Sequence, residues 1–146
     1  MSNETMAKFG WPHSEIAAYA HWTVLARPKQ VTLGSLVLVN RSQATAFAAV
    51  GAAAFAELGL VIADIEATLS RLWGYDKINY LMLMMVDPQV HFHVLPRYRG
   101  PRTFAGRTFS DPAWPGPPNL AVAEDLSADD LTAIQNALKA AWPKLP

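Results

Sequence analysis

The chain of 146 residues lacks several features that would by themselves indicate a function. It contains no cysteine, which excludes disulfide bonds and catalysis by a thiolate. Twelve Lys and Arg residues balance twelve Asp and Glu residues, so the net charge of zero predicts neither a nucleic acid nor a membrane surface as partner. The sequence also begins without the basic and apolar segments of an export signal, so we expect a cytoplasmic protein.

Long apolar runs are missing too. The most apolar stretch, 44–60, contains Glu57 and is shorter than the roughly 20 residues that a membrane span needs. The sequence shows no internal repeat. With 51% hydrophobic residues it has enough apolar side chains for a substantial core, and we expect a single domain over 1–146.

Segment 89–97 is the most informative part of the chain, because polar and apolar residues alternate along it. On a β-strand, successive side chains point to opposite faces, so Gln89, His91 and His93 share one face, and the intervening apolar residues share the other. Pro96 has no amide proton and is expected to end the regular pairing of this strand.

Two histidines on one strand face allow three interpretations. They fill a half-buried surface, they bind a metal ion, or one of them attacks an electrophile while the other stabilises the developing anion. A metal site normally needs a third protein ligand, and no further cluster of His, Asp or Glu stands out, although Asp87 or a distant histidine could complete one. Imidazole suits nucleophilic catalysis because its unperturbed pKa lies near neutral pH.

The same segment resembles the signature of the histidine triad (HIT) superfamily of nucleotide hydrolases and transferases, which reads His-φ-His-φ-His-φ-φ and is often followed by Pro-Arg. Gln89 stands in place of the first histidine, and Ser35 stands where the family often has another histidine. Segments 27–35, 75–80 and 114–118 resemble a bacterial branch of the superfamily. The resemblance implies an α+β fold with an antiparallel sheet, one long packed helix and a C-terminal helix.

The resemblance also implies a reaction. His91 matches the histidine that attacks the α-phosphorus and carries the nucleotidyl group, and His93 matches the one that contacts the phosphate oxygens. The implied function is hydrolysis or transfer at the α-phosphate of a nucleoside phosphoramidate or a dinucleoside polyphosphate. No cofactor is required, although a divalent cation could accompany a polyphosphate. A purine nucleotide or its conjugate is the expected ligand, and a homodimer is the expected assembly.

The other candidate site residues fall into two groups. Gln89 is expected to steady the charge on the phosphate, and Arg97 is expected to bind phosphate because alternation places it on the histidine face. The nucleotide-binding candidates are Leu25 and Arg27, which the family geometry places near base and ribose, and Asn79, which lies on the strand before the motif.

Two alternative functions remain open. Glutamine cannot become cationic or relay a proton as imidazole does, so Gln89 and Ser35 favour a nucleotide-binding or regulatory module with weak catalysis. The second alternative is a metal-dependent enzyme that uses His91 and His93 as ligands.

Periodicity and turn residues predict the remaining elements. We expect strands at 22–26, 35–40 and 77–86, with a short turn at 86–88 leading into the motif strand. A long helix is expected at 52–73 and ended by Gly74, after a short helix at 42–50 capped by Ser42. The core spans about 20–98. A docked tail without regular structure follows at 99–126, then a helix at 127–142 capped by Ser127. Residues 1–21 give no clear prediction.

Overall fold

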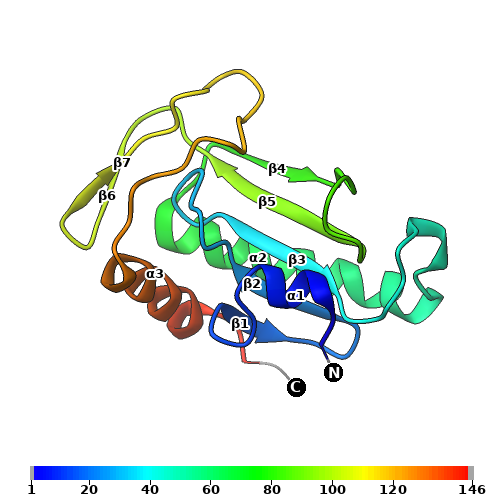
Figure 1. Cartoon of the computed structure of the whole chain (residues 1–146). Coiled ribbons are helices and arrows are strands. Elements are labelled where there is room, and N and C mark those ends of the chain that lie inside the picture. Colours follow the sequence, from blue (N-terminus) through cyan, green and yellow to red (C-terminus); the bar gives the residue numbers. More distant parts are fainter. Residues whose placement is uncertain (1, 145–146) are drawn as a thin grey trace.

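The computed structural model describes residues 2–144 and contains one five-stranded sheet (Figure 1). The strand order is β1-β2-β3-β5-β4, and all neighbouring strands are antiparallel. The strands are β1 (Glu15–Ala18), β2 (Trp22–Ala26), β3 (Leu36–Asn40), β4 (Lys77–Leu81) and β5 (His91–Arg97). The helices are α1 (Glu4–Lys8), α2 (Ala52–Trp73) and α3 (Ala128–Ala141). This is the expected α+β fold. No helix within residues 2–144 is long and apolar enough to cross a lipid bilayer.

Helix α2 begins and ends where the sequence predicts. Val61, Ile65 and Leu69 recur at a four-residue spacing and are fully buried. Burial of each aliphatic side chain contributes roughly 1.5–3 kcal/mol, which outweighs the roughly 1 kcal/mol of a side-chain N-cap that is missing at the start of α2. The helix stops at Gly74, whose left-handed backbone (φ 56°) lets its N–H donate to the Ser70 carbonyl at 2.9 Å.

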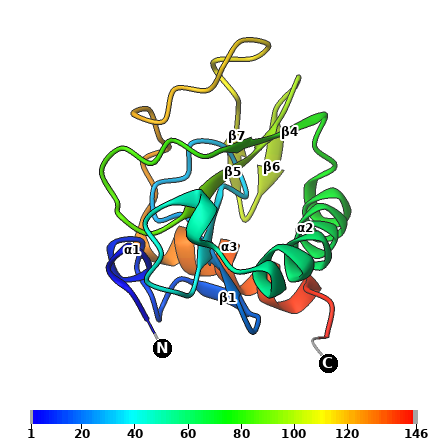
Figure 2. The same cartoon turned by 90° about the vertical axis from the view of Figure 1, so that its right-hand side faces the viewer.

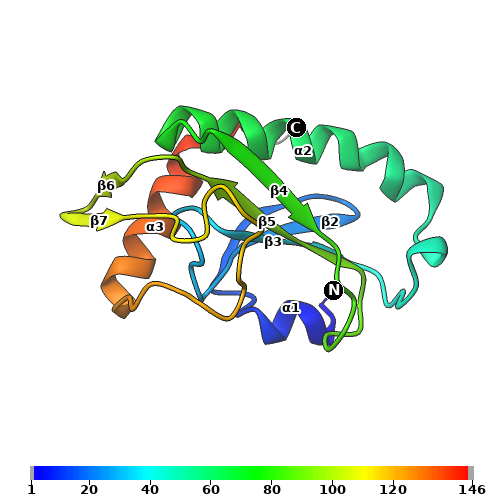
Figure 3. The ribbon, with the colours of Figure 1, turned by 90° about the horizontal axis from the view of Figure 1, so that it is seen from above.

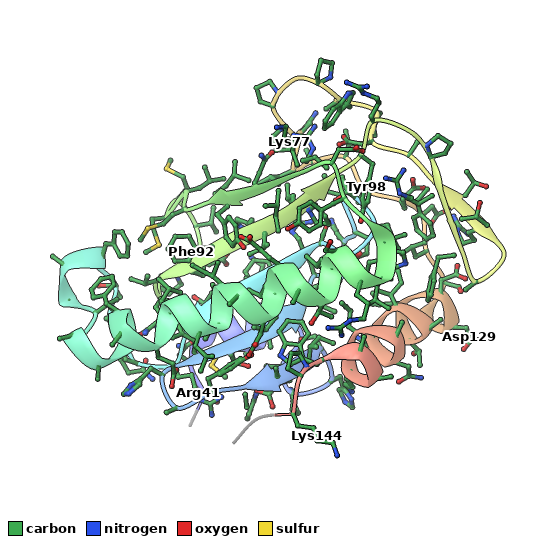
Figure 4. All side chains as sticks on the ribbon, turned by 180° about the vertical axis from the view of Figure 1, so that it is seen from behind. Arg41, Lys77, Phe92, Tyr98, Asp129 and Lys144 are labelled. Atoms are coloured by element: carbon green, nitrogen blue, oxygen red, sulfur yellow. The ribbon has the colours of Figure 1, made fainter. Side chains whose placement is uncertain are left out.

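The two faces of the sheet carry different layers. Helices α2 and α3 cover one face, and α1 with the segment that follows it covers the other (Figures 2 and 3). Figure 4 shows α2 running across the whole sheet. The core under α2 and α3 includes residues from every layer: Val24, Leu36, Leu38, Val94, Ile65, Leu69, Ile134 and Leu138. The smaller core under α1 consists of Met6, Phe9, Leu25, Val37 and Val39.

The predicted strand at 77–86 is too long. Strand β4 ends at Leu81, and residues 82–90 form an irregular connection instead of a short turn. Met84 has a positive φ of 53°, and the side chain of Met85 is 84% exposed. The apolar run therefore leaves the sheet after Leu81, and only Met82 and Met84 of the five residues 82–86 pack against the core under α2.

Pro96 does not end the pairing of β5, which continues through Arg97. The Arg97 carbonyl accepts from the Asp76 N–H, so Arg97 directs its backbone groups toward β4 and Pro96 directs its own toward β3. The β3 ladder has already stopped at the Leu36–Val94 pair. The missing amide of Pro96 therefore costs no ladder hydrogen bond.

Two other segments differ from expectation, and the C-terminal helix agrees with it. Only a 3₁₀ turn, Phe47–Ala49, forms where a capped helix was expected, and Ser42 instead donates to the Asn40 side chain. The tail contains a hairpin of β6 (Arg102–Phe104) and β7 (Arg107–Phe109). Positive φ values at Ala105 and Gly106 permit its tight turn, so the prediction of no regular structure was wrong there. Helix α3 has the expected cap, since Ser127 and Asp130 form a reciprocal capping box.

Candidate functional site

The fold places the two histidines of the motif side by side. His91 and His93 lie opposite Val39 and Val37 in the β3–β5 register, on the sheet face that α1 covers. Their ring centroids are 5.1 Å apart, and the rings meet edge to face. The alternation predicted from the sequence therefore produces an adjacent pair of imidazoles.

The hydrogen bond of His91 sets its tautomer. Its Nδ1 lies 2.8 Å from the backbone carbonyl oxygen of Gln89. A carbonyl can only accept, so Nδ1 carries the proton and Nε2 of the neutral ring keeps its lone pair. This arrangement is the one that a nucleophilic imidazole requires.

His93 is held in the neutral form. Burial is the largest cause that lowers its pKa, and the charges of Arg27 and His91 act in the same direction. Together, against the opposing effect of Asp87, they bring the pKa to about 4. Its Nδ1 is buried and has no hydrogen-bond partner within residues 2–144. The unpaired Nδ1 of a neutral ring can donate or accept one hydrogen bond, according to the tautomer of the ring.

The side-chain oxygen of Gln89 contacts α1, and the predicted role of this residue at the phosphate stays a prediction. Its side-chain oxygen accepts from the backbone nitrogen of Thr5 at 3.0 Å and from the Thr5 hydroxyl at 2.8 Å. The Gln89 backbone N–H in turn donates to the Thr5 hydroxyl oxygen at 3.0 Å. These contacts tie the motif to α1, so the glutamine oxygen is already occupied.

Phe9, at the C-terminal end of α1, covers both histidines. Its ring centroid lies 5.9 Å from that of His91 and 5.6 Å from that of His93. The two histidines are only 2% and 6% exposed. Access to the nucleophilic nitrogen therefore depends on the position of Phe9.

A cavity of about 370 Å³ opens beside the pair, between α1 and the segments that follow β2 and β4. This volume is in the range of small-molecule sites. His93 lines the cavity and His91 does not. The complete lining is Lys8, Phe9, Arg27, Pro28, Lys29, Val86, Asp87 and His93. A larger cavity of about 510 Å³ lies near the start of α2, but neither motif histidine borders it, so the smaller cavity is the relevant one.

The guanidinium of Arg97 makes several contacts within the fold, and its predicted role in phosphate binding stays a prediction. Its guanidinium binds the Asp111 carboxylate through Nε at 2.7 Å and Nη2 at 3.1 Å, with both side chains almost fully buried. Nη1 donates to the Asn79 side chain, and Nη2 also donates to the Gly116 carbonyl. Arg97 thus anchors the tail, and Asn79, the predicted nucleotide contact, is engaged by the same guanidinium.

The remaining predicted residues have different environments. Leu25 is completely buried under α1 and does not reach the cavity. Arg27 lines the cavity, as expected for a ligand contact. Ser35 is fully buried, and its hydroxyl donates to the Thr32 carbonyl in the turn before β3. Gly34 in that turn approaches α2 so closely that a Cβ would lie 2.9 Å from the Trp73 ring.

The N-terminal contributors to the site were not predicted. Thr5, Lys8 and Phe9 all reach the motif or its cavity from a segment that periodicity leaves unassigned. Asn3 caps α1 through its side chain, and such a cap is the one local indication of a helix. No local pattern indicates that this helix packs on the histidines.

Metal-ligating side chains do not cluster around the pair. Within residues 2–144 no group of three or more His, Cys, Asp or Glu side chains is placed to hold an ion.

Comparisons with known proteins identify the fold. No family model and no curated protein matches this sequence. A histidine triad (HIT) protein from Sinorhizobium meliloti 1021 matches with a TM-score of 0.73 at 20% identity, over 96% of this chain and 95% of that one. A histidine triad protein from Marinobacter aquaeolei VT8 has a TM-score of 0.74 at 20% identity, with 97% and 95% covered. A hypothetical histidine triad nucleotide-binding protein from Sulfolobus tokodaii strain7 has a TM-score of 0.66 at 13% identity, with 88% and 82% covered.

Proposed function

We propose that this chain, which has the fold of histidine triad proteins, is a nucleotide hydrolase or transferase that acts at the α-phosphate. The proposed substrate is a purine nucleoside phosphoramidate or a dinucleoside polyphosphate. The hydrogen bond from His91 Nδ1 to the Gln89 carbonyl carries the proposal, because it leaves Nε2 as a free base next to His93. The covalent step on His91 requires no cofactor. A divalent cation would only bind the polyphosphate chain of a substrate that has one.

The reaction follows in two displacements. Nε2 of His91 bonds to the α-phosphorus, and the bond from phosphorus to the leaving oxygen or nitrogen breaks. The leaving group keeps that electron pair and takes a proton from solvent. The ring becomes cationic, and the Gln89 carbonyl at 2.8 Å from Nδ1 stabilises it. Water then adds to phosphorus, Nε2 departs with its electron pair, and the proton of the water passes to solvent. An alcohol in place of water gives transfer.

His93 and Phe9 have supporting roles in this scheme. Neutral His93 donates a hydrogen bond to a phosphate oxygen that approaches from the cavity. Phe9 separates the cavity from His91, so its ring has to move before phosphorus reaches Nε2.

The test uses adenosine 5′-phosphoramidate and diadenosine tetraphosphate. The wild-type protein is expected to release AMP and to show a covalent nucleotidyl adduct on His91 by mass spectrometry. His91→Ala should abolish both, whereas His13→Ala, at an exposed histidine outside the site, should leave both unchanged. Turnover that survives in His91→Ala would exclude this residue as the nucleophile.

A second candidate function is a nucleotide-binding module with little turnover. The 2% exposure of His91 and the occupied side chain of Gln89 favour it. Measurable AMP binding with the same negligible turnover in wild type and His91→Ala would support the module. A faster reaction in Gln89→His would instead show that the missing imidazole limits an enzyme.

We also propose a homodimer. Strand β4 lies at one edge of the sheet and leaves a row of backbone groups unpaired. The connection that follows it exposes the apolar side chains of Leu83, Met85 and Val86. A second copy would cover both features. Analytical ultracentrifugation should find a dimer that Met85→Glu weakens, and a monomer at every concentration would contradict the assembly.

A further inference from the structure

The side chain of Arg27 is buried without an anionic partner. It is 8% exposed, and its Nη1 donates to the backbone carbonyl of Lys29 at 2.6 Å. Its Nε is buried and makes no hydrogen bond, and no carboxylate within residues 2–144 forms an ion pair with this guanidinium. A buried charge with no counter-charge is costly in free energy, so a group that supplies a negative charge there would be stabilised.

His93, at the same cavity, also has a buried nitrogen without a hydrogen-bond partner within residues 2–144. This nitrogen is Nδ1, and the His93 side chain lines the cavity together with Arg27. The β2–β3–β5 register aligns Leu25, Val37 and His93 in one row, and Arg27 follows Leu25 by two residues on the same face. Arg27 and His93, each with a buried nitrogen that makes no hydrogen bond, therefore line the same cavity.

The charges around the cavity favour an anion. Lys8 and Lys29 join Arg27 in the lining, against the single carboxylate of Asp87. That carboxylate pairs with Lys8 at 3.1 Å, so the charges of Arg27 and Lys29 stay uncompensated. Phosphate oxygens match a guanidinium in both charge and geometry.

We propose that the Arg27 guanidinium, with Lys29, forms a binding subsite for a second phosphate group of the ligand, beside His93 and separate from the α-phosphate that faces His91. This inference rests on the proposed function and narrows its substrate class to nucleotides that carry two phosphate groups. The second phosphate is either the β-phosphate of a 5′-polyphosphate chain or a phosphate on the ribose. Both place the same chemical group against the same cations.

Calorimetric titration with three unreactive ligands tests the subsite and separates the two sources. The ligands are AMP, adenosine 5′-(α,β-methylene)diphosphate and adenosine 3′,5′-bisphosphate, measured at one low salt concentration. One charge-assisted hydrogen bond contributes about 1.5–3 kcal/mol, so at least one of the two-phosphate ligands should bind about tenfold or more tightly than AMP. The ligand that gains identifies the source of the phosphate.

Variants then show which side chains cause the gain in affinity from the second phosphate. Arg27→Gln should reduce this gain to about twofold or less. The gain is the ratio of two affinities measured on the same variant, so a change in AMP binding itself does not affect the reading. Lys29→Glu should also remove most of this gain in affinity. Because Lys29 is exposed, its substitution tests the subsite without disturbing a buried side chain. Lys139→Gln, on the exposed surface of α3, is the matched control and should retain it.

Several outcomes would overturn the inference. AMP binding with no gain from a second phosphate would mean that ordered water satisfies Arg27 and His93 instead. A gain that persists in both Arg27→Gln and Lys29→Glu would place the second phosphate elsewhere. These results leave the proposed function intact, whereas no binding of any adenine nucleotide would overturn the proposed function and the subsite together.

Discussion

The side-chain oxygen of Gln89 accepts two hydrogen bonds from Thr5, from its backbone nitrogen at 3.0 Å and from its hydroxyl at 2.8 Å. A residue of the motif that resembles the histidine triad signature therefore contacts the N-terminal helix α1 through its side-chain oxygen. The same helix delivers Phe9 onto the two histidines. The hydrogen bonds of Gln89 therefore help to fix the position of Phe9, and the position of Phe9 determines whether a ligand can reach His91.

The first prediction concerns this connection. Gln89→Ala leaves two buried donors of Thr5 without a partner, which should lower the free energy of unfolding by about 1–3 kcal/mol. Thr5→Val removes the hydroxyl alone and should cost less. Urea denaturation of both single variants and the double variant measures the coupling. Losses that simply add would show that the two side chains do not act together.

The second prediction concerns access to His91. Phe9→Ala should speed the modification of His91 by diethyl pyrocarbonate several-fold, because the ring that covers it is gone. Truncation of a core Phe costs about 3–5 kcal/mol, so Phe9→Leu gives a milder comparison. Peptide mass spectrometry follows each histidine, and the exposed His21 serves as the internal control. If wild-type His91 already reacts as fast as His21, the ring does not restrict access.

The third prediction follows from the lowered pKa of His93. Its pKa is about 4 in the folded protein and about 6.5 when unfolded, so the unfolded chain binds more protons between these values. Stability contributed by neutral His93 is complete above pH 6.5 and is lost as pH falls toward 4, by roughly 2–3 kcal/mol.

Urea denaturation at pH 7.5 and pH 4.5 measures this loss. His93→Gln should remove most of the difference between the two pH values, because glutamine does not titrate. His21→Gln, at an exposed histidine, should leave the difference as it is in wild type. An unchanged difference in His93→Gln would assign the acid sensitivity to another group.

The fourth prediction concerns the buried pair of Arg97 and Asp111. Asp111→Asn leaves the guanidinium buried without a counter-charge and should destabilise the protein by about 3–5 kcal/mol. Limited proteolysis should then cut within 99–126, since Asp111 lies in that tail. The matched control is Lys8→Gln, which breaks a pair whose lysine side chain is 58% exposed and should cost no more than about 1 kcal/mol. Equal effects of the two substitutions would contradict this role.

Local pattern was sufficient for much of this protein. Repeats of three and four residues located α2, glycine marked its end, and alternation placed His91 and His93 on one strand face. Such features depend on residues that are near each other in sequence, and backbone geometry converts them directly into helices and strand faces. The long helix and the motif strand were predictable for that reason, whereas the antiparallel α+β fold was implied by the resemblance of the motif to the histidine triad signature.

Packing between distant segments decided the rest. Arg97 lies on the histidine face, yet its guanidinium pairs with the carboxylate of Asp111, fourteen residues along the chain. Gln89 is bound by Thr5 across 84 residues of sequence, and Phe9 closes over a strand that lies equally far along the chain. Hydrogen-bond partners and burial depend on which surfaces meet in three dimensions, and the spacing of residues along one strand carries no information about the segment that will cover it.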